Sequence, residues 1–338
     1  MAALTRSHRQ RGRVVEAEHV ADGVRRIVLE VDHPESAAPG THVDVELPIR
    51  GGRQLRSYSV VRSYSVVRSE DGGRRLTLSV QLSPASRGGS EAMHALAVGE
   101  ELTVTGPVQS FPLSVGAGRY VLVAGGIGVT ALVAMASALR RRGADYELVL
   151  VGRSRRVMAY VDELRAEHGE RLRVHVDDEG TPLSVPDLVG EIASAPNADT
   201  TELYMCGPIG LMDAIRSSWT EHALPPTSLR FETFGSSGRF DAEDFVVRLP
   251  QHDREVTVPR DASILEALTA AGVETLSDCR KGECGLCLAK IVDVDGTVDH
   301  RDVFLSEAQK QRSNSLCLCV SRAVADGGDR ASLTLHLT

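Results

Sequence analysis

The sequence has no long apolar run and no block of one charge, and each absence excludes a class of protein. No stretch reaches the ~18 apolar residues that a membrane-spanning helix needs. The 338 residues carry a formal net charge of −8, which argues against nucleic acids and anionic membranes as main partners. The segment from Met1 to Arg13 lacks the apolar core of a secretory signal. We therefore expect a cytoplasmic protein that binds neither a membrane nor a nucleic acid.

Cysteine is also scarce, yet five of the six cysteines lie within 41 residues. In a reducing compartment such clustering favours metal ligation over disulfide bonds. Cys279-x4-Cys284-x2-Cys287 has the spacing of plant-type [2Fe–2S] ferredoxins, in which a distant fourth cysteine completes the set. Either Cys317 or Cys319 can be that fourth ligand. A zinc site is the alternative, but the Cys317-Leu-Cys319 arm is tighter than the usual zinc-binding pair.

The loop between these cysteines contains the small residues that a cluster requires. Thiolates must converge on two irons from one tight turn, and Gly282 and Gly285 allow the backbone to make it. The N–H groups of the loop can then point at the sulfur atoms and tune the redox potential. We predict a [2Fe–2S] cluster in the C-terminal part of the chain.

Three patterns of secondary structure follow one another along the chain. Up to residue 115, short runs rich in Val, Leu and Thr alternate with turn signals, which is typical of a small antiparallel β-barrel. From residue 116, apolar strands alternate with helices and predict a doubly wound α/β domain. Beyond the Gly-Ser-Ser-Gly linker at 235–238, short strands and a capped helix surround the cysteine loop. We expect a multi-domain protein with domains at 1–115, 116–235 and 236–338.

A glycine-rich turn joins the first strand of the α/β domain, Tyr120–Ala124, to the helix Val129–Arg142. Backbone N–H groups and the helix dipole at such a turn can hold a pyrophosphate, although the full G-x-G-x-x-G fingerprint is absent and a plain tight turn is the alternative. Cys206-Gly207-Pro208 ends a later strand at the edge where open α/β sheets bind ligands, with a buried small cysteine as the simpler reading. The candidate nucleotide-binding residues are Gly125, Gly126, Ile127, Gly128, Thr130, Cys206, Gly207 and Pro208.

One hexapeptide, Arg-Ser-Tyr-Ser-Val-Val, occurs twice in succession, at 56–61 and at 62–67. An insertion of even length keeps the in/out alternation of a strand. Each copy contains Arg-x-Tyr-Ser, in which Arg can bind a flavin phosphate and Tyr can lie against the isoalloxazine ring; a strand with one wet and one packed face is the alternative. The short turn at 70–73 favours the second copy as the pairing strand and the first as a bulged loop. The candidates are Arg56, Ser57, Tyr58, Ser59, Arg62, Ser63, Tyr64 and Ser65.

A further phosphate cradle is predicted at Arg87, Gly88, Gly89 and Ser90, where a turn of backbone N–H groups is joined to an arginine. The alternative for this segment is an ordinary loop.

Taken in order, these elements resemble the phthalate dioxygenase reductase and vanillate demethylase reductase family over essentially the whole chain. The resemblance implies a flavin barrel, a nucleotide domain and a C-terminal β-grasp ferredoxin domain of the α+β class. It implies FMN rather than FAD, because these reductases lack an adenine-binding extension. It also places Phe231 or Phe234 near the flavin. The segment Cys319-Val320-Ser321-Arg322-Ala323 resembles the ending in which the family's cysteine binds iron, so Cys319 is favoured as the fourth ligand.

The choice of pyridine nucleotide is less clear. The run Arg153-Ser154-Arg155-Arg156 follows the second strand, where a ribose would lie. Arginines accommodate the 2′-phosphate of NADPH, whereas the resemblance implies NADH. We expect NADH, with Arg153 among the residues that contact it.

These expectations describe an NAD(P)H-dependent reductase that passes electrons through FMN and a [2Fe–2S] cluster to a partner oxygenase of the Rieske type. A cytochrome P450 as acceptor is the close alternative, and a redox-sensing iron–sulfur flavoprotein is the distant one. The cofactors supply the chemistry, so no catalytic side chain is expected, and His300 and Asp302 are interpreted as structural. We expect a monomer.

Overall fold

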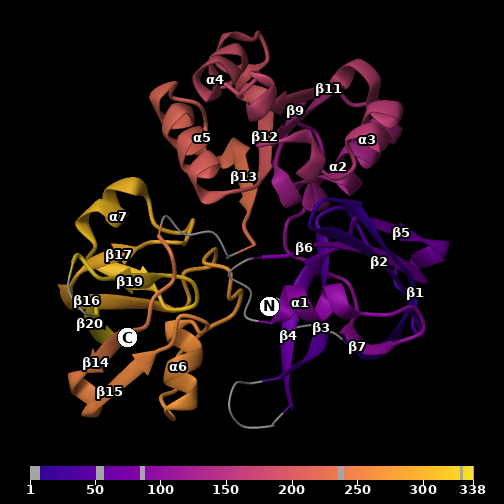
Figure 1. Ribbon diagram of the computed structural model, residues 1–338. Helices are drawn as coiled ribbons and strands as arrows, with labels where there is room; N and C mark the ends of the chain where they lie inside the picture. The colour runs from indigo at the N-terminus through magenta and orange to yellow at the C-terminus, as the bar shows by residue number, and fades with distance from the viewer. Residues whose placement is uncertain (1–7, 51–56, 84–87, 235–239, 328–329, 338) are drawn as a thin grey trace. The chain divides into compact units, whose positions relative to one another are not determined.

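Three larger sheets organise the chain, which the computed structural model describes at residues 8–50, 57–83, 88–234, 240–327 and 330–337. Contacts divide the chain into two units. The first unit comprises Met1–Gly207 and Ala214–Glu232, and the second comprises Pro208–Asp213 and Thr233–Thr338. Figure 1 shows an antiparallel and a parallel sheet in the first unit and a smaller mixed sheet in the second.

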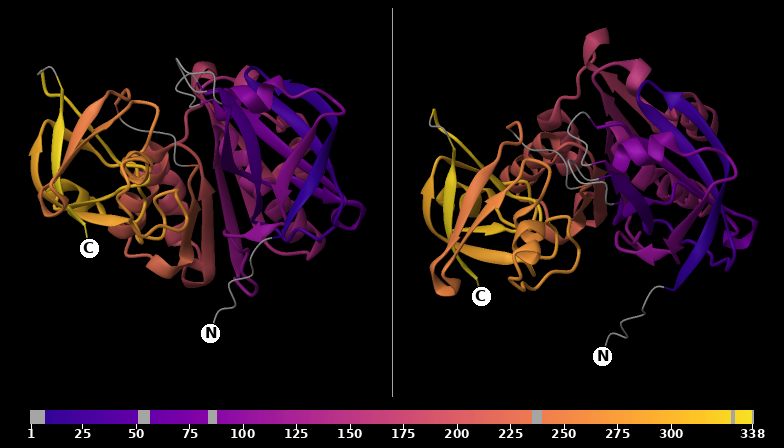
Figure 2. Two further views of the ribbon diagram at one scale, coloured as in Figure 1. Left: turned by 90° about the horizontal axis from the view of Figure 1, so that it is seen from below. Right: turned by 60° about the horizontal axis from the view of Figure 1, so that its bottom comes forward.

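The antiparallel sheet is formed by eight strands in the order β4-β3-β7-β1-β2-β6-β5, with β8 paired to β3. Their alternating side chains enclose one apolar core that includes Ile27, Leu29, Leu76 and Leu78, as expected for strands with one buried face. The sheet curls around this core (Figure 2). The strands are β1 (Arg9–Ala21), β2 (Val24–Val31), β3 (Thr41–Arg50), β4 (Ser57–Ser65), β5 (Arg68–Glu70), β6 (Arg75–Gln81), β7 (Glu101–Thr105) and β8 (Val108–Gln109).

The repeated hexapeptide is part of one regular strand. Strand β4 pairs with β3 without a register shift, from His42 opposite Ser65 to Arg50 opposite Ser57. The expectation of a bulged loop in the first copy is therefore wrong. The insertion lengthens the strand by an even number of residues, and β3 is long enough to pair with all of Ser57–Ser65.

The parallel sheet has the strand order β11-β10-β9-β12-β13. The chain moves outward from β9 to β10 and β11 and then returns to the other side of β9, so the topological switch point lies between β9 and β12. Helices α2 and α3 cover one face and α4 and α5 the other (Figure 1). The strands are β9 (Arg119–Gly125), β10 (Tyr146–Gly152), β11 (Leu172–Val176), β12 (Thr201–Cys206) and β13 (Leu229–Glu232), and the helices are α2 (Val129–Arg141), α3 (Val161–His168), α4 (Val185–Ser194) and α5 (Ile209–Glu221).

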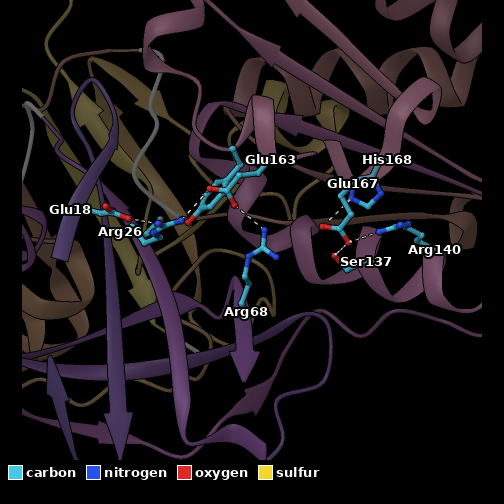
Figure 3. Close-up of polar contacts among 10 residues, drawn as sticks. Glu18, Arg26, Arg68, Ser137, Arg140, Glu163, Glu167 and His168 are labelled. Atoms are coloured by element: carbon cyan, nitrogen blue, oxygen red, sulfur yellow. Dashed lines mark hydrogen bonds and ion pairs between the residues drawn. The ribbon is translucent and has the colours of Figure 1, made fainter. Parts of the chain in front are cut away.

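The two sheets of the first unit are joined through the start of α3. Tyr160, in a left-handed conformation at φ 68°, buries its side chain and places its hydroxyl 2.5 Å from Ser79 Oγ on β6. One turn later, Glu163 accepts hydrogen bonds from Arg26 at 3.1 Å and from Arg68 at 3.0 Å. Figure 3 shows Glu163 between these two arginines. A buried hydrogen bond and an exposed ion-pair cluster therefore fix α3 against the antiparallel sheet.

The second unit has a mixed five-stranded sheet in the order β15-β14-β20-β16-β18, with helix α6 packed against β15. Phe245, Val247 and Leu333 belong to its core and are fully buried. A two-stranded sheet, β17 with β19, lies beside it. The elements are β14 (Phe245–Leu249), β15 (Arg254–Val258), α6 (Ile264–Ala270), β16 (Leu288–Asp295), β17 (Thr297–Asp299), α7 (Glu307–Arg312), β18 (Ser315–Cys317), β19 (Arg322–Val324) and β20 (Ser332–Leu337). This arrangement confirms the expected α+β ferredoxin fold.

Candidate functional site

Two predicted nucleotide-binding turns lie against each other at the switch point of the parallel sheet. A Cβ atom on Gly128 would stand 2.1 Å from the carbonyl oxygen of Cys206, and one on Gly207 would stand 3.0 Å from the Cα of Gly125. Only glycine permits this approach of backbone to backbone. The carboxyl ends of β9 and β12 therefore form a continuous backbone-lined edge, which is the position at which open α/β sheets bind ligands.

The turn before α2 has open space at Gly126. Gly126 has a φ of 53° and nothing within 4 Å of the place where its Cβ would be. Thr130 is buried, and its hydroxyl donates to the carbonyl of Ile127 at 3.0 Å. A helix N-terminus that follows such a turn can hold a pyrophosphate. Cys206 is fully buried, and the carbonyl of Pro208 accepts from the N–H groups that begin α5.

The arginine run after β10 is largely engaged in ion pairs. Arg155 donates to both carboxylate oxygens of Glu179, at 2.8 and 2.7 Å. Arg156 donates to Asp22 at 3.2 Å. Arg153 is exposed, and its carbonyl accepts from the N–H of Asp178 at 3.0 Å. Glu179 and Asp22 are functional candidates that the sequence alone did not reveal, because each is distant from the run in the chain.

The second copy of Arg-x-Tyr-Ser ends at a buried carboxylate that the sequence interpretation had not singled out. Glu232, at the end of β13, is 3 % exposed. Its two oxygens lie 3.4 Å from Ser65 Oγ and 3.2 Å from Ser110 Oγ, and each hydroxyl donates to one oxygen. Tyr64 is half-buried. The signal for Glu232 is its place between Phe231 and Phe234, the two aromatic residues that the family resemblance puts near the flavin.

The other predicted flavin residues are described to different extents. Arg56 and Arg87 lie outside the described residues, and the segment 57–63 is described as backbone only. Gly88 has a φ of 89° and precedes α1 (Gly89–Ala95), and the hydroxyl of Ser90 accepts from the N–H of Ser83 at 3.2 Å. Phe231 is half-buried on β13, with the guanidinium of Arg216 5.6 Å from its ring centroid.

The cysteine loop directs its backbone at one sulfur atom. The N–H groups of Lys281, Glu283 and Cys284 point at Cys279 Sγ over 3.5, 3.4 and 3.4 Å. Three such donors stabilise a thiolate, which is the form that binds iron. Gly285 is required here because a Cβ would stand 2.3 Å from the ring of Phe304. The loop therefore fits an iron–sulfur cluster in both its small residues and its donors.

The five clustered cysteines interact as a group of two and a group of three. Among the described residues, no group of three or more Cys, His, Asp or Glu side chains is arranged to hold a metal ion. The Cys279 thiol instead interacts with Cys284, and burial raises its pKa. The thiols of Cys317 and Cys319 lower the pKa of Cys287 to about 3. Four of these five cysteines suffice for a cluster of two irons, in which each iron takes two thiolates.

Cys317 and Cys319 differ in what surrounds them. Both are buried and hydrogen-bonded to Cys287, which raises the pKa of both thiols. Cys319 also interacts with Cys279 and with the backbone N–H of Gly282 in the ligand loop. Cys317 ends β18 and is influenced instead by the buried Asp302. These surroundings favour Cys319 as the residue that closes the ligand set.

Asp302 and Arg322 hold the loops around the cysteines. Asp302 is fully buried and accepts from the N–H of Leu305 at 2.8 Å and from the hydroxyl of Ser321 at 3.3 Å. Arg322 donates to the carbonyls of Glu243 and Pro259, each at 2.9 Å. These contacts are those of structural residues.

Comparison with known proteins identifies two domains and close relatives. Residues 11–112 match the family described as an oxidoreductase FAD-binding domain, and residues 247–324 match the 2Fe-2S iron-sulfur cluster binding domain. The chain is 35% identical over 322 residues to a phenoxybenzoate dioxygenase subunit beta of Ectopseudomonas oleovorans, with 94% of each chain covered. It is 35% identical over 291 residues to a vanillate O-demethylase oxidoreductase of Pseudomonas sp. (strain HR199 / DSM 7063), covering 84% of this chain and 86% of the relative.

Solved structures agree with these relatives. The structure of phthalate dioxygenase reductase, described as modular for electron transfer from pyridine nucleotides to [2Fe-2S], covers 97% of both chains with a TM-score of 0.72 and 29% identity. The chain belongs to the phthalate dioxygenase reductase family. An intact type IV self-sufficient cytochrome P450 monooxygenase also matches, with a TM-score of 0.64 and 35% identity over 97% of this chain and 41% of that one.

As a phthalate dioxygenase reductase relative, the chain is an NAD(P)H-dependent electron-transfer oxidoreductase with a flavin-binding domain and a [2Fe–2S] ferredoxin domain. The three-part architecture expected from the sequence is confirmed. No helix in the described part of the chain is long and apolar enough to cross a membrane.

Proposed function

We propose that this chain is the reductase component of an oxygenase system, carrying electrons from NADH through FMN and a [2Fe–2S] cluster to a terminal oxygenase. One observation carries the proposal. The same chain has a backbone-lined edge at the switch point of its parallel sheet and a cysteine loop whose N–H groups point at the Cys279 sulfur. In this proposal, residues 1–115 bind the flavin, residues 116–235 bind the nucleotide and residues 236–338 bind the cluster.

NADH is proposed to bind along Gly125–Gly128 and Cys206–Pro208, with Thr130 and Arg153 beside it. The glycines let the pyrophosphate approach the backbone at the start of α2, because a side chain at Gly128 would collide with Cys206. A flavin held in the first domain would supply hydride acceptance and one-electron release. The role of this backbone-lined edge is to hold the nucleotide with its nicotinamide end toward that flavin.

FMN is proposed as the flavin on the family resemblance. The second hexapeptide copy, Arg62–Ser65, is the proposed contact, because Ser65 is held by the buried Glu232. Tyr64 would lie against the ring system, with Gly88–Ser90 and Arg87 at the phosphate and Phe231 near the isoalloxazine. Glu232 and Ser110 would fix the Ser65 hydroxyl and keep water out of this position. Acid release of the flavin followed by chromatography distinguishes FMN from FAD.

The cluster is proposed to be held by Cys279, Cys284, Cys287 and Cys319. The three backbone donors to Cys279 Sγ would stabilise the ligated thiolate. Leu286, within this loop, is 50 % exposed, and Phe304, whose ring lies against Gly285, is 45 % exposed. An acceptor protein with an apolar contact surface would dock there, within reach of the cluster.

The acceptor is proposed to be a Rieske-type oxygenase, because the relatives named above are a dioxygenase subunit and an O-demethylase oxidoreductase. The P450 alternative has its own support, since a self-sufficient P450 monooxygenase contains a region like this chain. Reduction of ferricyanide or cytochrome c with NADH tests the reductase assignment. Turnover by the flavin- and iron-loaded protein is expected; its absence would favour a redox-sensing role.

A further inference from the structure

The arginines after β10 raise the question of how this chain treats the 2′-phosphate that distinguishes NADPH from NADH. In doubly wound domains the adenosine ribose lies beyond the carboxyl end of the second strand. Here that strand is β10, and Arg153, Arg155 and Arg156 follow it directly. An unpaired guanidinium at this position would bind a phosphate through a strong, two-pronged contact.

The carboxylate of Glu179 already makes such a bidentate contact with the guanidinium of Arg155. Nε and Nη2 of Arg155 lie 2.8 and 2.7 Å from the two oxygens of one carboxylate. These hydrogen bonds lower the pKa of Glu179 and raise that of Arg155, so both groups stay charged at neutral pH. A carboxylate therefore fills the fork that a phosphate would otherwise use.

The turn that carries Glu179 is held beside the ribose position by the backbone. β11 is the parallel neighbour of β10, and the residues Asp177–Glu179 follow it as one turn of 3-10 helix. The N–H of Asp178 donates to the carbonyl of Arg153 at 3.0 Å. Three carboxylates are thus fixed next to the arginine run, where they oppose a doubly charged phosphate.

A second arginine of the run, Arg156, is paired with a residue outside the acidic turn. Arg156 donates to Asp22, in the turn between β1 and β2, at 3.2 Å, and its carbonyl accepts from the N–H of Asp22 at 2.8 Å. Only Arg153 of the three has no side-chain partner within the described residues, and it lies beside the acidic turn. Two of the three guanidinium groups of the run are therefore paired before any nucleotide binds.

We propose that Glu179 is the residue that selects NADH over NADPH, by holding Arg155 in an ion pair that excludes the 2′-phosphate. This inference rests on the proposed function for the identity of the donor site. It goes beyond that function by naming Glu179 as the residue whose carboxylate determines the coenzyme preference, through its ion pair with Arg155. Glu179 is a positioning residue, because it acts on Arg155 and need not touch the nucleotide.

The test compares coenzyme preference in the flavin- and iron-loaded protein, with ferricyanide as acceptor. Wild type is expected to have the higher kcat/KM with NADH. Glu179→Gln should raise the ratio of kcat/KM for NADPH to that for NADH about tenfold or more, because Arg155 is freed. The double variant Arg155→Ala/Glu179→Gln should lose that gain. Glu191→Gln, which breaks another exposed pair, with Arg173 at 3.1 Å, is the matched control and should keep the wild-type ratio.

A binding measurement separates this inference from the proposed function. Calorimetry with 2′,5′-ADP and 5′-ADP reports the ribose site without electron transfer, and Glu179→Gln should strengthen only the 2′,5′-ADP affinity. The inference is overturned if the wild-type protein prefers NADPH. It is also overturned if Glu179→Gln changes neither the kcat/KM ratio nor the affinity for 2′,5′-ADP, or if the double variant Arg155→Ala/Glu179→Gln keeps the raised kcat/KM ratio. If neither nucleotide reduces the flavin, the proposed function fails, and the ADP comparison still decides the role of Glu179.

Discussion

Gly128 approaches Cys206 so closely that a Cβ atom on the glycine would stand 2.1 Å from the cysteine's carbonyl oxygen. Gly128 lies in the turn that follows β9 and Cys206 ends β12, on either side of the switch point of the sheet. Their contact makes one binding edge from two motifs that are far apart in the sequence. The edge at which the pyrophosphate of NADH is proposed to bind depends on this approach.

Gly128→Ala is therefore expected to damage this edge. Backbone atoms must shift to admit the methyl group, at a cost of about 1–3 kcal/mol in unfolding free energy, and the KM for NADH should rise. Gly210→Ala on α5 is the control, since nothing lies within 4 Å of its Cβ position and a helical Ala is favourable by up to about 1 kcal/mol. Chemical unfolding and steady-state kinetics of both variants check this. Equal behaviour of the two variants would contradict the account.

The fourth cluster ligand can be decided by two serine substitutions. Cys319→Ser should abolish the visible absorption and the EPR signal of the reduced cluster, because Cys319 interacts with both Cys279 and Cys287. Cys317→Ser should retain both signals, because Cys317 lies at the end of β18 and hydrogen-bonds only to Cys287 among the proposed ligands. Loss of the cluster in Cys317→Ser alone would reverse the assignment.

The buried His168 should make the stability of the protein depend on pH. Its Nδ1 lies 2.7 Å from the hydroxyl of Tyr146 on β10, and its Nε2 has no hydrogen-bond partner among the described residues. Burial lowers the pKa of His168; the carboxylate of Glu167 opposes this, and Arg140 on α2 and Arg171 before β11 add to it. Figure 3 shows His168 beside Glu167.

Because the folded pKa of His168 lies below the unfolded value of about 6.5, the unfolded chain takes up the proton first as pH falls. Stability should be complete above that value and decline below it, by up to about 1.4 kcal/mol per pH unit. Urea unfolding between pH 7.5 and 5.5 should show a smaller decline in His168→Gln than in wild type. The exposed His336 supplies the control variant, His336→Gln. Identical declines in wild type and His168→Gln would rule out this role.

The junction between the two sheets of the first unit should depend more on Tyr160 than on Glu163. Tyr160→Phe removes the hydroxyl that lies 2.5 Å from Ser79 Oγ and leaves a buried polar atom unpaired, at a cost of about 1–3 kcal/mol. Glu163→Gln weakens an exposed ion pair worth less than about 1 kcal/mol. Chemical denaturation of both variants tests the order, and a larger loss in Glu163→Gln would contradict it.

Much of the fold could be predicted from local signals. The strand Phe245–Leu249 and the capped helix at Ser263 and Glu266 follow directly from alternation and capping. Helix α7 was missed although Ser306 and Gln309 form the same capping box, because its six residues are too few to show helical periodicity. Helix α4 was missed although Ser184 caps it, because Pro186 and Gly190 within its ten residues are poor helix formers.

The site was only partly predictable, because its decisive contacts join distant parts of the chain. The cysteine spacing and the glycine turns are local, so the sequence showed them. The contacts of Glu232 with Ser65 and of Glu179 with Arg155 arise from the order of the strands. The two residues of the first contact are 167 positions apart in the sequence, and those of the second are 24 positions apart. The arginine run alone suggested a phosphate site, and only the structure revealed the carboxylate that fills it.

The most direct test of the central claim is an anaerobic titration of the flavin- and iron-loaded protein with NADH, followed by visible absorption and EPR. The account predicts that NADH bleaches the flavin and that the reduced-cluster EPR signal then appears in the same molecule, without an added mediator. A flavin that NADH leaves oxidised, or a reduced flavin beside a cluster that stays oxidised, would contradict it.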